Sequence, residues 1–176
     1  MILETPRLIL AEFSFDDLDR LAELVSDPAA VRYIGDGEPA SYAHARHWLE
    51  RTLSNYARSG FGYWRVSLRE AEEFIGWCGP SPIVVEESAE IQLGYLLTPE
   101  YWGQGIATEA AIAVREHVFA HLGVERLVAL IDSGNHRSKR VAAKVGMTYE
   151  RNVAFASSWK AVPRRLELHS VSAERK

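Results

Sequence analysis

The sequence predicts an α+β fold. Its 176 residues are nearly half apolar (47%), which is enough for one hydrophobic core and too apolar for a disordered chain. Runs of strand character and runs of helical periodicity follow in the order strand, two helices, three strands, helix, strand, helix, two strands. The sequence contains no internal repeat and no linker, so residues 1–176 are expected to form a single domain.

The first half of the chain is predicted to contain one strand and two main helices. Ser14 stands three residues before Asp17, the spacing of a capping box that starts a helix, and Pro28 stops this helix. Ser41 caps the second helix and Gly60 ends it. The predicted elements are a strand at 7–13, a helix from 14 to 27, a helical turn at 31–34, a loop at 35–39 and a helix from 41 to 60.

The second half is predicted to contain the rest of the sheet and two helices. The runs 61–68 and 74–78 form an antiparallel hairpin across an acidic turn, and Gly79-Pro80-Ser81-Pro82 breaks the second strand. The other predicted elements are strands at 90–97, 127–131, 147–155 and 164–169, helices at 110–121 and 135–145, and a frayed tail at 170–176.

The turn that follows the strand 90–97 has the features of an anion site. It reads Trp102-Gly103-Gln104-Gly105-Ile106-Ala107-Thr108-Glu109 and opens a helix. The first N–H groups of a helix have no internal partner and lie at the positive end of its dipole, and small residues there let an anion approach the backbone. The segment therefore predicts a phosphate site.

Two known phosphate motifs do not fit this turn. A P-loop needs Lys and then Ser or Thr after its second glycine, where this chain has Ile106 and Ala107. A dinucleotide fingerprint needs three glycines on the first strand-to-helix turn, and this segment lies past the middle of the chain. On the turn alone, Gly103 and Gly105 can equally well shape a simple turn in which Thr108 caps the helix.

Charge and composition exclude several classes of function. A net charge of −4 argues against broad nucleic-acid binding, and no apolar run approaches the ~20 residues of a membrane-spanning helix. The N-terminus has no apolar signal core, so we expect a cytoplasmic protein that binds neither nucleic acid nor membrane. Cys78, the only cysteine, is expected to be a buried apolar residue and not a nucleophile.

A second segment, Asn135-His136-Arg137-Ser138 through Lys144-Val145-Gly146-Met147, adds to the glycine turn. Together they resemble motifs A and B of the GNAT superfamily of acyl-CoA-dependent N-acyltransferases. The runs Leu3–Leu10 and Phe74–Gly79 resemble the branch that acetylates the N-terminal amines of ribosomal proteins (RimJ/RimL-like), in which a Trp at the place of Trp102 is usual. The resemblance covers nearly the whole chain, from about residue 3 to residue 168.

This resemblance implies a mixed, mostly antiparallel sheet with helices on both faces. In that fold the strands that carry Leu96 and Leu130 run parallel but splay apart. The pantetheine arm of CoA enters the opening and pairs with the first strand as an added strand would. Acetyl-CoA is then the cosubstrate and no metal is needed, and the protein is expected to be a monomer or a homodimer.

The resemblance also assigns the cofactor contacts. Main-chain N–H groups of the turn would hold the pyrophosphate. The basic residues Lys139, Arg140 and Lys144 would meet the 3′-phosphate of CoA, or else form a solvated helix face. The expected cofactor contacts are Leu96, Leu97, Gln104, Gly105, Ile106, Ala107, Thr108, Asn135, Ser138 and Lys144.

The implied reaction is attack of a neutral amine on a thioester carbonyl. A backbone N–H near Leu96 or Leu97 would stabilise the developing oxyanion. Many relatives protonate the leaving thiolate with a Tyr one turn past the Ser, but this chain has Ala142 there. Ser138 is therefore expected to be the proton donor, directly or through water, if the thiolate needs one.

A general base must accept the proton of the amine, directly or through water. Glu90, at the start of the cofactor strand, is the first candidate because several relatives place a carboxylate there. Glu150 and Glu167 on the last strands, and His44 or His47 on the second helix, are alternatives.

Motifs A and B bind the donor and leave the acceptor open. It is a protein N-terminal amine or a small amine such as an amino acid, a polyamine or a drug. The segments 35–39 and 152–163 would shape its site. Two other functions stay open: a CoA-binding regulator that has lost turnover, which Ala142 allows, and a phosphate-binding module that does not bind CoA.

Overall fold

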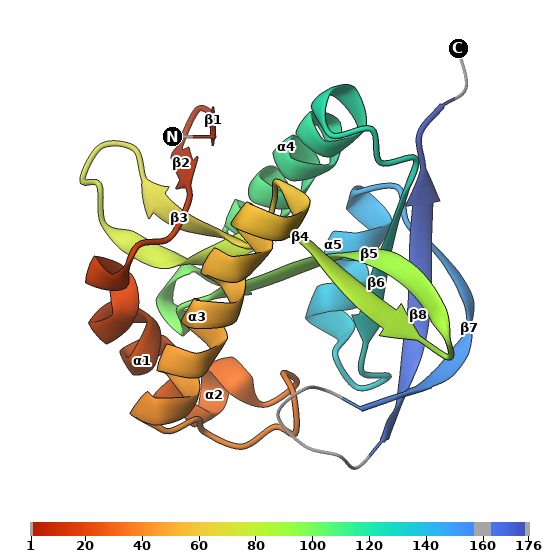
Figure 1. Ribbon diagram of the computed structural model, residues 1–176, viewed down its shortest axis with the longest axis horizontal. Helices are drawn as coiled ribbons and strands as arrows, with labels where there is room; N and C mark the ends of the chain where they lie inside the picture. Colours follow the sequence, from red (N-terminus) through yellow and green to blue (C-terminus); the bar gives the residue numbers. More distant parts are fainter. Residues whose placement is uncertain (1, 157–162, 175–176) are drawn as a thin grey trace.

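A computed structural model describes residues 2–156 and 163–174, and it contains one sheet with helices on both faces (Figure 1). Over these residues the sheet has eight strands in the order β1-β2-β3-β4-β5-β6-β8-β7. All neighbours pair antiparallel except β5 and β6, which are parallel. The mixed, mostly antiparallel sheet of the prediction is therefore confirmed. The strands are Leu3–Glu4 (β1), Leu8–Ala11 (β2), Trp64–Leu68 (β3), Phe74–Val85 (β4), Ser88–Leu97 (β5), Arg126–Ile131 (β6), Thr148–Phe155 (β7) and Arg164–Ser172 (β8).

The sheet separates the hydrophobic core into two main clusters, one on each of its faces. Along β4, Trp77 packs with the N-terminal helices while its neighbour Cys78 packs with α4, because successive side chains of a strand point to opposite faces. The cluster that packs against α4 contains more of the buried strand residues than the cluster on the other face. The helices are Leu18–Ser26 (α1), Pro28–Val31 (α2), Tyr42–Ser59 (α3), Ile106–His121 (α4) and His136–Lys144 (α5).

The parallel strands β5 and β6 separate after a single point of pairing. Their ladder contains only the pair Gln92 and Val128, while β5 continues to Leu97 along β4 and β6 continues to Ile131 along β8. The carboxyl ends of the two strands thus stand apart. This opening is the splay that the resemblance implied.

Strand β4 does not break at the predicted Gly79–Pro82 segment. Its pairing with β5 continues without a register shift from Gly76 to Val85. Thr98, just after β5, donates its N–H to Ile75 O, so the even-numbered residues of β4 direct their backbone groups away from β5. On that side β3 pairs only as far as Cys78. Pro80 and Pro82 therefore remove no N–H that the ladder needs, and the strand tolerates them.

Several boundaries differ from the prediction, and α4 for example starts at Ile106 and not at residue 110. The helical turn placed at 31–34 is α2, which starts at Pro28 because Asp27 caps it and Pro is favoured in the first turn. The capping box of Ser14 and Asp17 is present, but it opens a 3₁₀ turn at Phe15–Asp17 before α1. The tail does not fray at Ser170, since β8 pairs with β6 through Ser172. Residues 175–176 of that predicted tail lie outside the described residues.

Candidate active site

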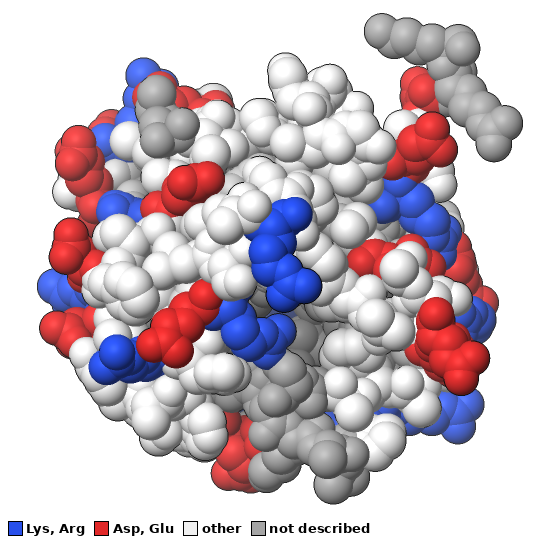
Figure 2. All heavy atoms as spheres, viewed as in Figure 1, with Lys and Arg blue, Asp and Glu red and all other residues white. Residues whose placement is uncertain are grey.

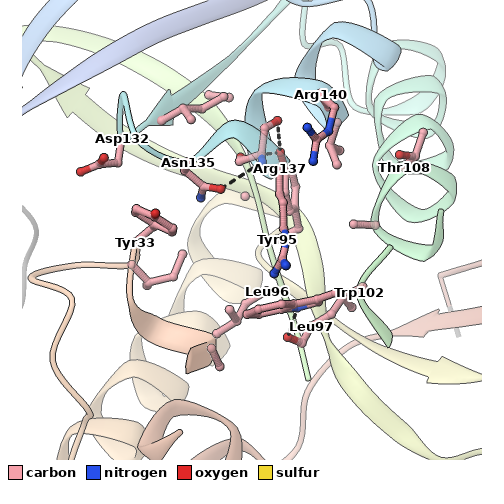
Figure 3. Close-up of a pocket in the computed structure, with 18 of the residues that line it drawn as sticks. Tyr33, Tyr95, Leu96, Leu97, Trp102, Thr108, Asp132, Asn135, Arg137 and Arg140 are labelled. Atoms are coloured by element: carbon pink, nitrogen blue, oxygen red, sulfur yellow. Dashed lines mark hydrogen bonds between the residues drawn. The ribbon is translucent and has the colours of Figure 1, made fainter. Parts of the chain in front are cut away.

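A pocket of about 760 Å³ occupies the opening between β5 and β6 (Figure 3). Its walls come from α2 and the loop after it, from the turn that leads into α4, and from one side of α5 along its length. We call it the splay pocket. It lies at the carboxyl ends of two parallel strands, which is where open sheets bind ligands.

The glycine turn presents an uncapped helix end to this pocket. Gly105 is the N-cap of α4 with φ +78°, in the left-handed region that glycine adopts without strain, and no side chain caps the helix. The first internal helical bond is from Glu109 N–H to Gly105 O. Thr108 lies inside the first turn, so the alternative in which it caps the helix is wrong. The N–H groups of the first turn before Glu109 therefore have no partner within the helix and are available to an anion that enters the pocket.

An ion pair braces this turn from behind. Arg7 donates from Nε to the Glu109 carboxylate at 2.6 Å and from a terminal nitrogen to Gln104 O at 3.0 Å. Thr5 donates its hydroxyl to the same carboxylate at 2.6 Å. The hydrogen bonds from Thr5 and Arg7 lower the pKa of Glu109 despite its partial burial. The charged form thus links the start of the chain to the first turn of α4.

Nine of the ten expected cofactor residues line the splay pocket. The exception is Gln104, whose side chain donates to Glu100 O and whose carbonyl accepts from Arg7. The nine are Leu96, Leu97, Gly105, Ile106, Ala107, Thr108, Asn135, Ser138 and Lys144. Asn135 also caps α5, because its side-chain oxygen accepts from Ser138 N–H at 3.1 Å.

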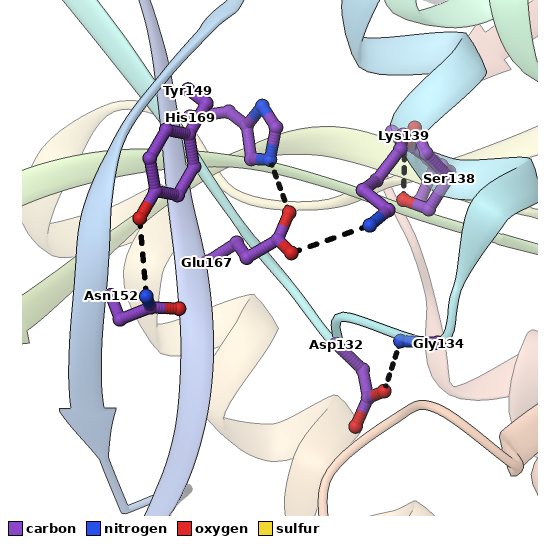
Figure 4. A network of polar contacts seen from close by, with 9 residues as sticks. Asp132, Gly134, Ser138, Lys139, Tyr149, Asn152, Glu167 and His169 are labelled. Atoms are coloured by element: carbon purple, nitrogen blue, oxygen red, sulfur yellow. Dashed lines mark hydrogen bonds and ion pairs between the residues drawn. The ribbon is translucent and has the colours of Figure 1, made fainter.

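The lining of the splay pocket is strongly basic although the chain is acidic overall. Arg32, Arg137, Arg140 and Lys144 line it, and Asp132 is the one carboxylate among the described lining residues. The Arg137 guanidinium stacks over Trp102, 4.8 Å from the ring centre. Of the predicted basic cluster, Lys139 does not belong here, since it pairs with Glu167 at 3.3 Å on the β8 side of α5 (Figure 4). Such a local excess of positive charge favours a polyanionic ligand.

Strand β5 directs free main-chain groups into the splay. Thr98 N–H points to β4, and backbone groups alternate along a strand, so Leu96 also points to β4 and Leu97 points to the side that β6 has left. The Leu97 carbonyl on that side accepts from Trp102 Nε1 at 2.9 Å. Of the two expected oxyanion donors, Leu97 N–H is therefore the one that faces the opening. Leu96 contributes its side chain to the lining.

Ser138 meets Tyr95, a residue to which the sequence analysis gave no role in the site. The Tyr95 hydroxyl lies 2.8 Å from Ser138 Oγ and donates to Ser138 O at 3.1 Å, and both residues line the pocket (Figure 3). Burial raises the pKa of Tyr95 to about 12, so the phenol is protonated at neutral pH. Ala142, where relatives carry a tyrosine, is buried. The pocket thus contains the hydrogen-bonded hydroxyls of Tyr95 on β5 and Ser138 on α5, although position 142 has no tyrosine.

A second pocket of about 450 Å³ adjoins the first on the α3 face of the sheet. We call it the side pocket. Tyr33, Trp77 and Leu96 are among the residues that line both pockets, so the two spaces meet at the opening of the strands. The predicted acceptor loop 35–39 contributes Asp36 and Glu38. Of the other predicted acceptor segment, residues 157–162 lie outside the described residues.

The structure does not bring the candidate bases to either pocket. Glu90 pairs with Ile83 before the strands separate, and its carboxylate accepts from Arg126 at 3.3 Å, so it lies outside the described lining of both pockets. Hydrogen bonds from Arg126 and Ser170 lower the pKa of Glu150 to about 2, which makes it a poor base. Hydrogen bonding to His169 lowers the pKa of Glu167 (Figure 4).

The histidine alternatives are also remote. His44 and His47 are exposed on α3 and belong to the described lining of neither pocket.

The carboxylate at the site is Asp132, which the sequence analysis missed. It follows β6 directly, and Arg164 holds it at 2.6 Å while Gly134 N–H donates to it at 2.9 Å. The sequence signal that could have identified Asp132 is its position as a polar residue just after a predicted parallel strand.

Neither a membrane-spanning helix nor a group of metal-ligating side chains is found in the part of the chain that the structure describes.

Comparison with known proteins identifies the family. Residues 7–148 match the model of the acetyltransferase (GNAT) domain. The uncharacterized N-acetyltransferase YoaA of Bacillus subtilis is 28% identical over 149 residues, which cover 85% of this chain and 84% of that protein. An acetyltransferase structure from Agrobacterium tumefaciens is 27% identical with a TM-score of 0.79, over 97% of this chain and 94% of that one.

One further structure bears on the branch. The ribosomal L7/L12 α-N-protein acetyltransferase RimL, in complex with coenzyme A, has a TM-score of 0.79 at 18% identity, over 97% of each chain. This likeness shows the shared fold and does not assign the branch. The fold and the pocket define an acyltransferase. The chain belongs to the GNAT acetyltransferase family.

Proposed function

We propose that the protein is an acetyl-CoA-dependent N-acetyltransferase that acetylates the primary amine of a protein N-terminus or of a small molecule. The observation that carries this proposal is the splay pocket, where an uncapped helix end and four basic side chains line an opened parallel strand pair. A CoA thioester matches it, because its phosphates suit the helix end and its amide-bearing arm suits the free edge of β5. The protein would bind it as cosubstrate and would need no metal.

The proposed reaction is direct transfer in a ternary complex. The amine nitrogen attacks the thioester carbonyl carbon, and Leu97 N–H stabilises the oxyanion, a contact worth about 3 kcal/mol in comparable sites. The oxyanion then collapses, the C–S bond breaks and the sulfur takes the hydroxyl proton of Ser138. Ser138 regains a proton through the hydrogen-bonded Tyr95 hydroxyl, which is reprotonated from solvent. The amine loses its proton to Asp132, directly or through water. The products are the N-acetyl amide and CoA.

We also propose the branch of the family, the cellular location and the oligomeric state. The opening strand, the run Phe74–Gly79 and Trp102 support descent within the RimJ/RimL-like branch, whatever the acceptor. The composition supports a cytoplasmic protein, and the resemblance to the family supports a monomer or a homodimer.

Calorimetry with acetyl-CoA, followed by an assay of free thiol release in the presence of amines, tests the proposal. We expect binding with a Kd in the micromolar range, about −8 kcal/mol, and release of one CoA for each amide formed. Binding without transfer to any amine would support the alternative, a CoA-binding regulator. No binding at all would support a phosphate module of another kind.

The substitutions Asp132→Asn and Glu90→Gln test two carboxylates against each other. We expect Asp132→Asn to lower kcat/KM about tenfold at neutral pH, because an alkyl ammonium must be deprotonated first. This deficit should shrink as the pH rises toward about 10, the ordinary pKa range of alkyl amines, where solution supplies the free amine. Rate measurements from pH 6 to about 10 check this. A larger loss in Glu90→Gln than in Asp132→Asn would restore Glu90 as the base.

A further inference from the structure

The side pocket is where the acceptor meets the thioester, and its walls constrain the acceptor. It opens on the face of the molecule that carries α3, where charged side chains stand around a hollow in the surface (Figure 2). Because Trp77, Gln92 and Leu96 line both pockets, an amine at their junction reaches a thioester that lies along β5. The rest of that amine must occupy the side pocket.

One wall of the side pocket is a stack of aromatic rings. Trp48 lies parallel to Tyr63, with ring centres 5.5 Å apart and an interplanar angle of 7°, and Tyr63 contacts Trp77 at 4.5 Å. Phe13 supports this stack edge-on against Trp48 at 5.6 Å. Burial raises the pKa of Tyr63 to about 12, so the wall carries no charge at neutral pH. It is an aromatic, uncharged surface.

The facing wall is also apolar. Leu130 of β6, Phe155 of β7 and Leu166 of β8 line it, and all three pack against the small buried cluster at that end of the sheet. The charged residues of the described lining are Asp36, Glu38 and Arg164, which come from the loop before α3 and from the start of β8. Arg164 is already bound to Asp132 and to Gly35 O. The two facing walls of this slot are thus apolar, and the charged side chains of the described lining belong to the loop before α3 and to the start of β8.

We infer that the acceptor is a small primary amine that carries an aromatic or branched aliphatic body. This inference rests on the proposed function and deepens it. A flat apolar body fills the slot and stacks on Trp48 and Tyr63. A polyamine would have to place further ammonium groups between apolar walls, and a peptide would have to leave backbone amides there without partners, and both are unfavourable.

Steady-state acetylation of phenethylamine, isoamylamine, spermidine and a hexapeptide with a free N-terminal serine tests the inference. Because one well-placed apolar group is worth about 10- to 200-fold in kcat/KM, we expect phenethylamine to exceed spermidine and the peptide by at least about tenfold. The inference is overturned if the kcat/KM of spermidine or of the peptide is more than about one tenth of that of phenethylamine.

A charge placed on the facing wall provides a second test. Leu166→Glu should lower the phenethylamine-to-spermidine ratio of kcat/KM by at least about tenfold, because the new carboxylate favours an ammonium and disfavours a ring. Ile83→Glu is the matched control, since Ile83 is also half-buried against the same cluster but lies outside the described pocket linings. It should leave the ratio unchanged. A folded Leu166→Glu variant with an unchanged ratio overturns the inference.

Failure of the acetyl-transfer proposal is distinguishable from failure of this inference. If acetyl-CoA binds but no amine in the panel is acetylated, the proposed function fails. Calorimetry of phenethylamine and spermidine with the CoA-bound protein then decides the pocket assignment. Tighter binding of phenethylamine supports it, and tighter or equal binding of spermidine overturns it.

Discussion

Replacing Gly105 with valine is expected to weaken acetyl-CoA binding at least about 100-fold, which corresponds to about 2.7 kcal/mol. Gly105 has φ +78°, a conformation in which a β-branched residue is strained by about 1–3 kcal/mol. A relaxed backbone would turn the first N–H groups of α4 away from the pocket. The added Cβ would also point toward the Arg7 guanidinium that braces the turn, 3.7 Å away, so the larger valine side chain would press on that brace. Isothermal titration with acetyl-CoA measures the loss.

Gly123→Val is the matched control for this substitution. Gly123 follows α4 and also has positive φ, +65°, with no atom within 4 Å of an added Cβ, and it lies outside the described pocket linings. It should carry a similar backbone strain and leave the Kd for acetyl-CoA unchanged. A Gly105→Val protein that is folded and binds acetyl-CoA within about threefold of wild type, less than 1 kcal/mol, contradicts the phosphate site on α4.

Loss of the hydroxyl pair is expected to slow turnover without weakening acetyl-CoA binding. Tyr95→Phe and Ser138→Ala should each lower kcat by about 10- to 100-fold, the lower part of the range for general acid catalysis, because a thiolate is a good leaving group. The two hydroxyls lie 2.8 Å apart and act on one proton, so the double variant should lose little more than either single one. Single-turnover rates of CoA release measure the effect.

The pH dependence separates this role from a packing role. A phenol with a pKa of about 12 keeps its proton at every pH below that value, so Tyr95 itself should cause no loss of kcat up to about pH 10. With an acetyl thioester of a more acidic thiol, the deficit of both variants should shrink, because that thiolate leaves without a proton. Tyr149→Phe, on an exposed residue outside the pocket linings, is the control. Equal deficits with both thioesters would show that the pair only packs.

The sequence predicted local structure well where the signal lies within a few neighbouring residues. A glycine turn between a strand and a helix specifies an uncapped N-terminus within about six residues, and Asn135 caps α5 as its position suggested. Strand β4 was misread at Pro80 and Pro82 because their tolerance depends on where β3 stops, which no neighbouring residue reveals. Of the two N–H groups expected as oxyanion donors, Leu97 could be preferred to Leu96 only because the hydrogen bond from Thr98 N–H to Ile75 O fixes the direction of the backbone groups of β5.

By itself the sequence determined most of the order of helices and strands, the fold class and the glycine turn that opens α4, because dihedral preferences, caps and periodicity act between residues a few positions apart. It missed the short strand β1 and predicted α2 only as a turn. Only the tertiary structure decided that Tyr95 meets Ser138 across 43 positions, that Asp132 lines the splay pocket while Glu90 does not, and that Trp48 and Tyr63 line the side pocket. These contacts depend on strand register and on the angle at which helices cross the sheet. A shift of one residue in the register of β5 would turn Tyr95 and Glu90 to the other face of the sheet.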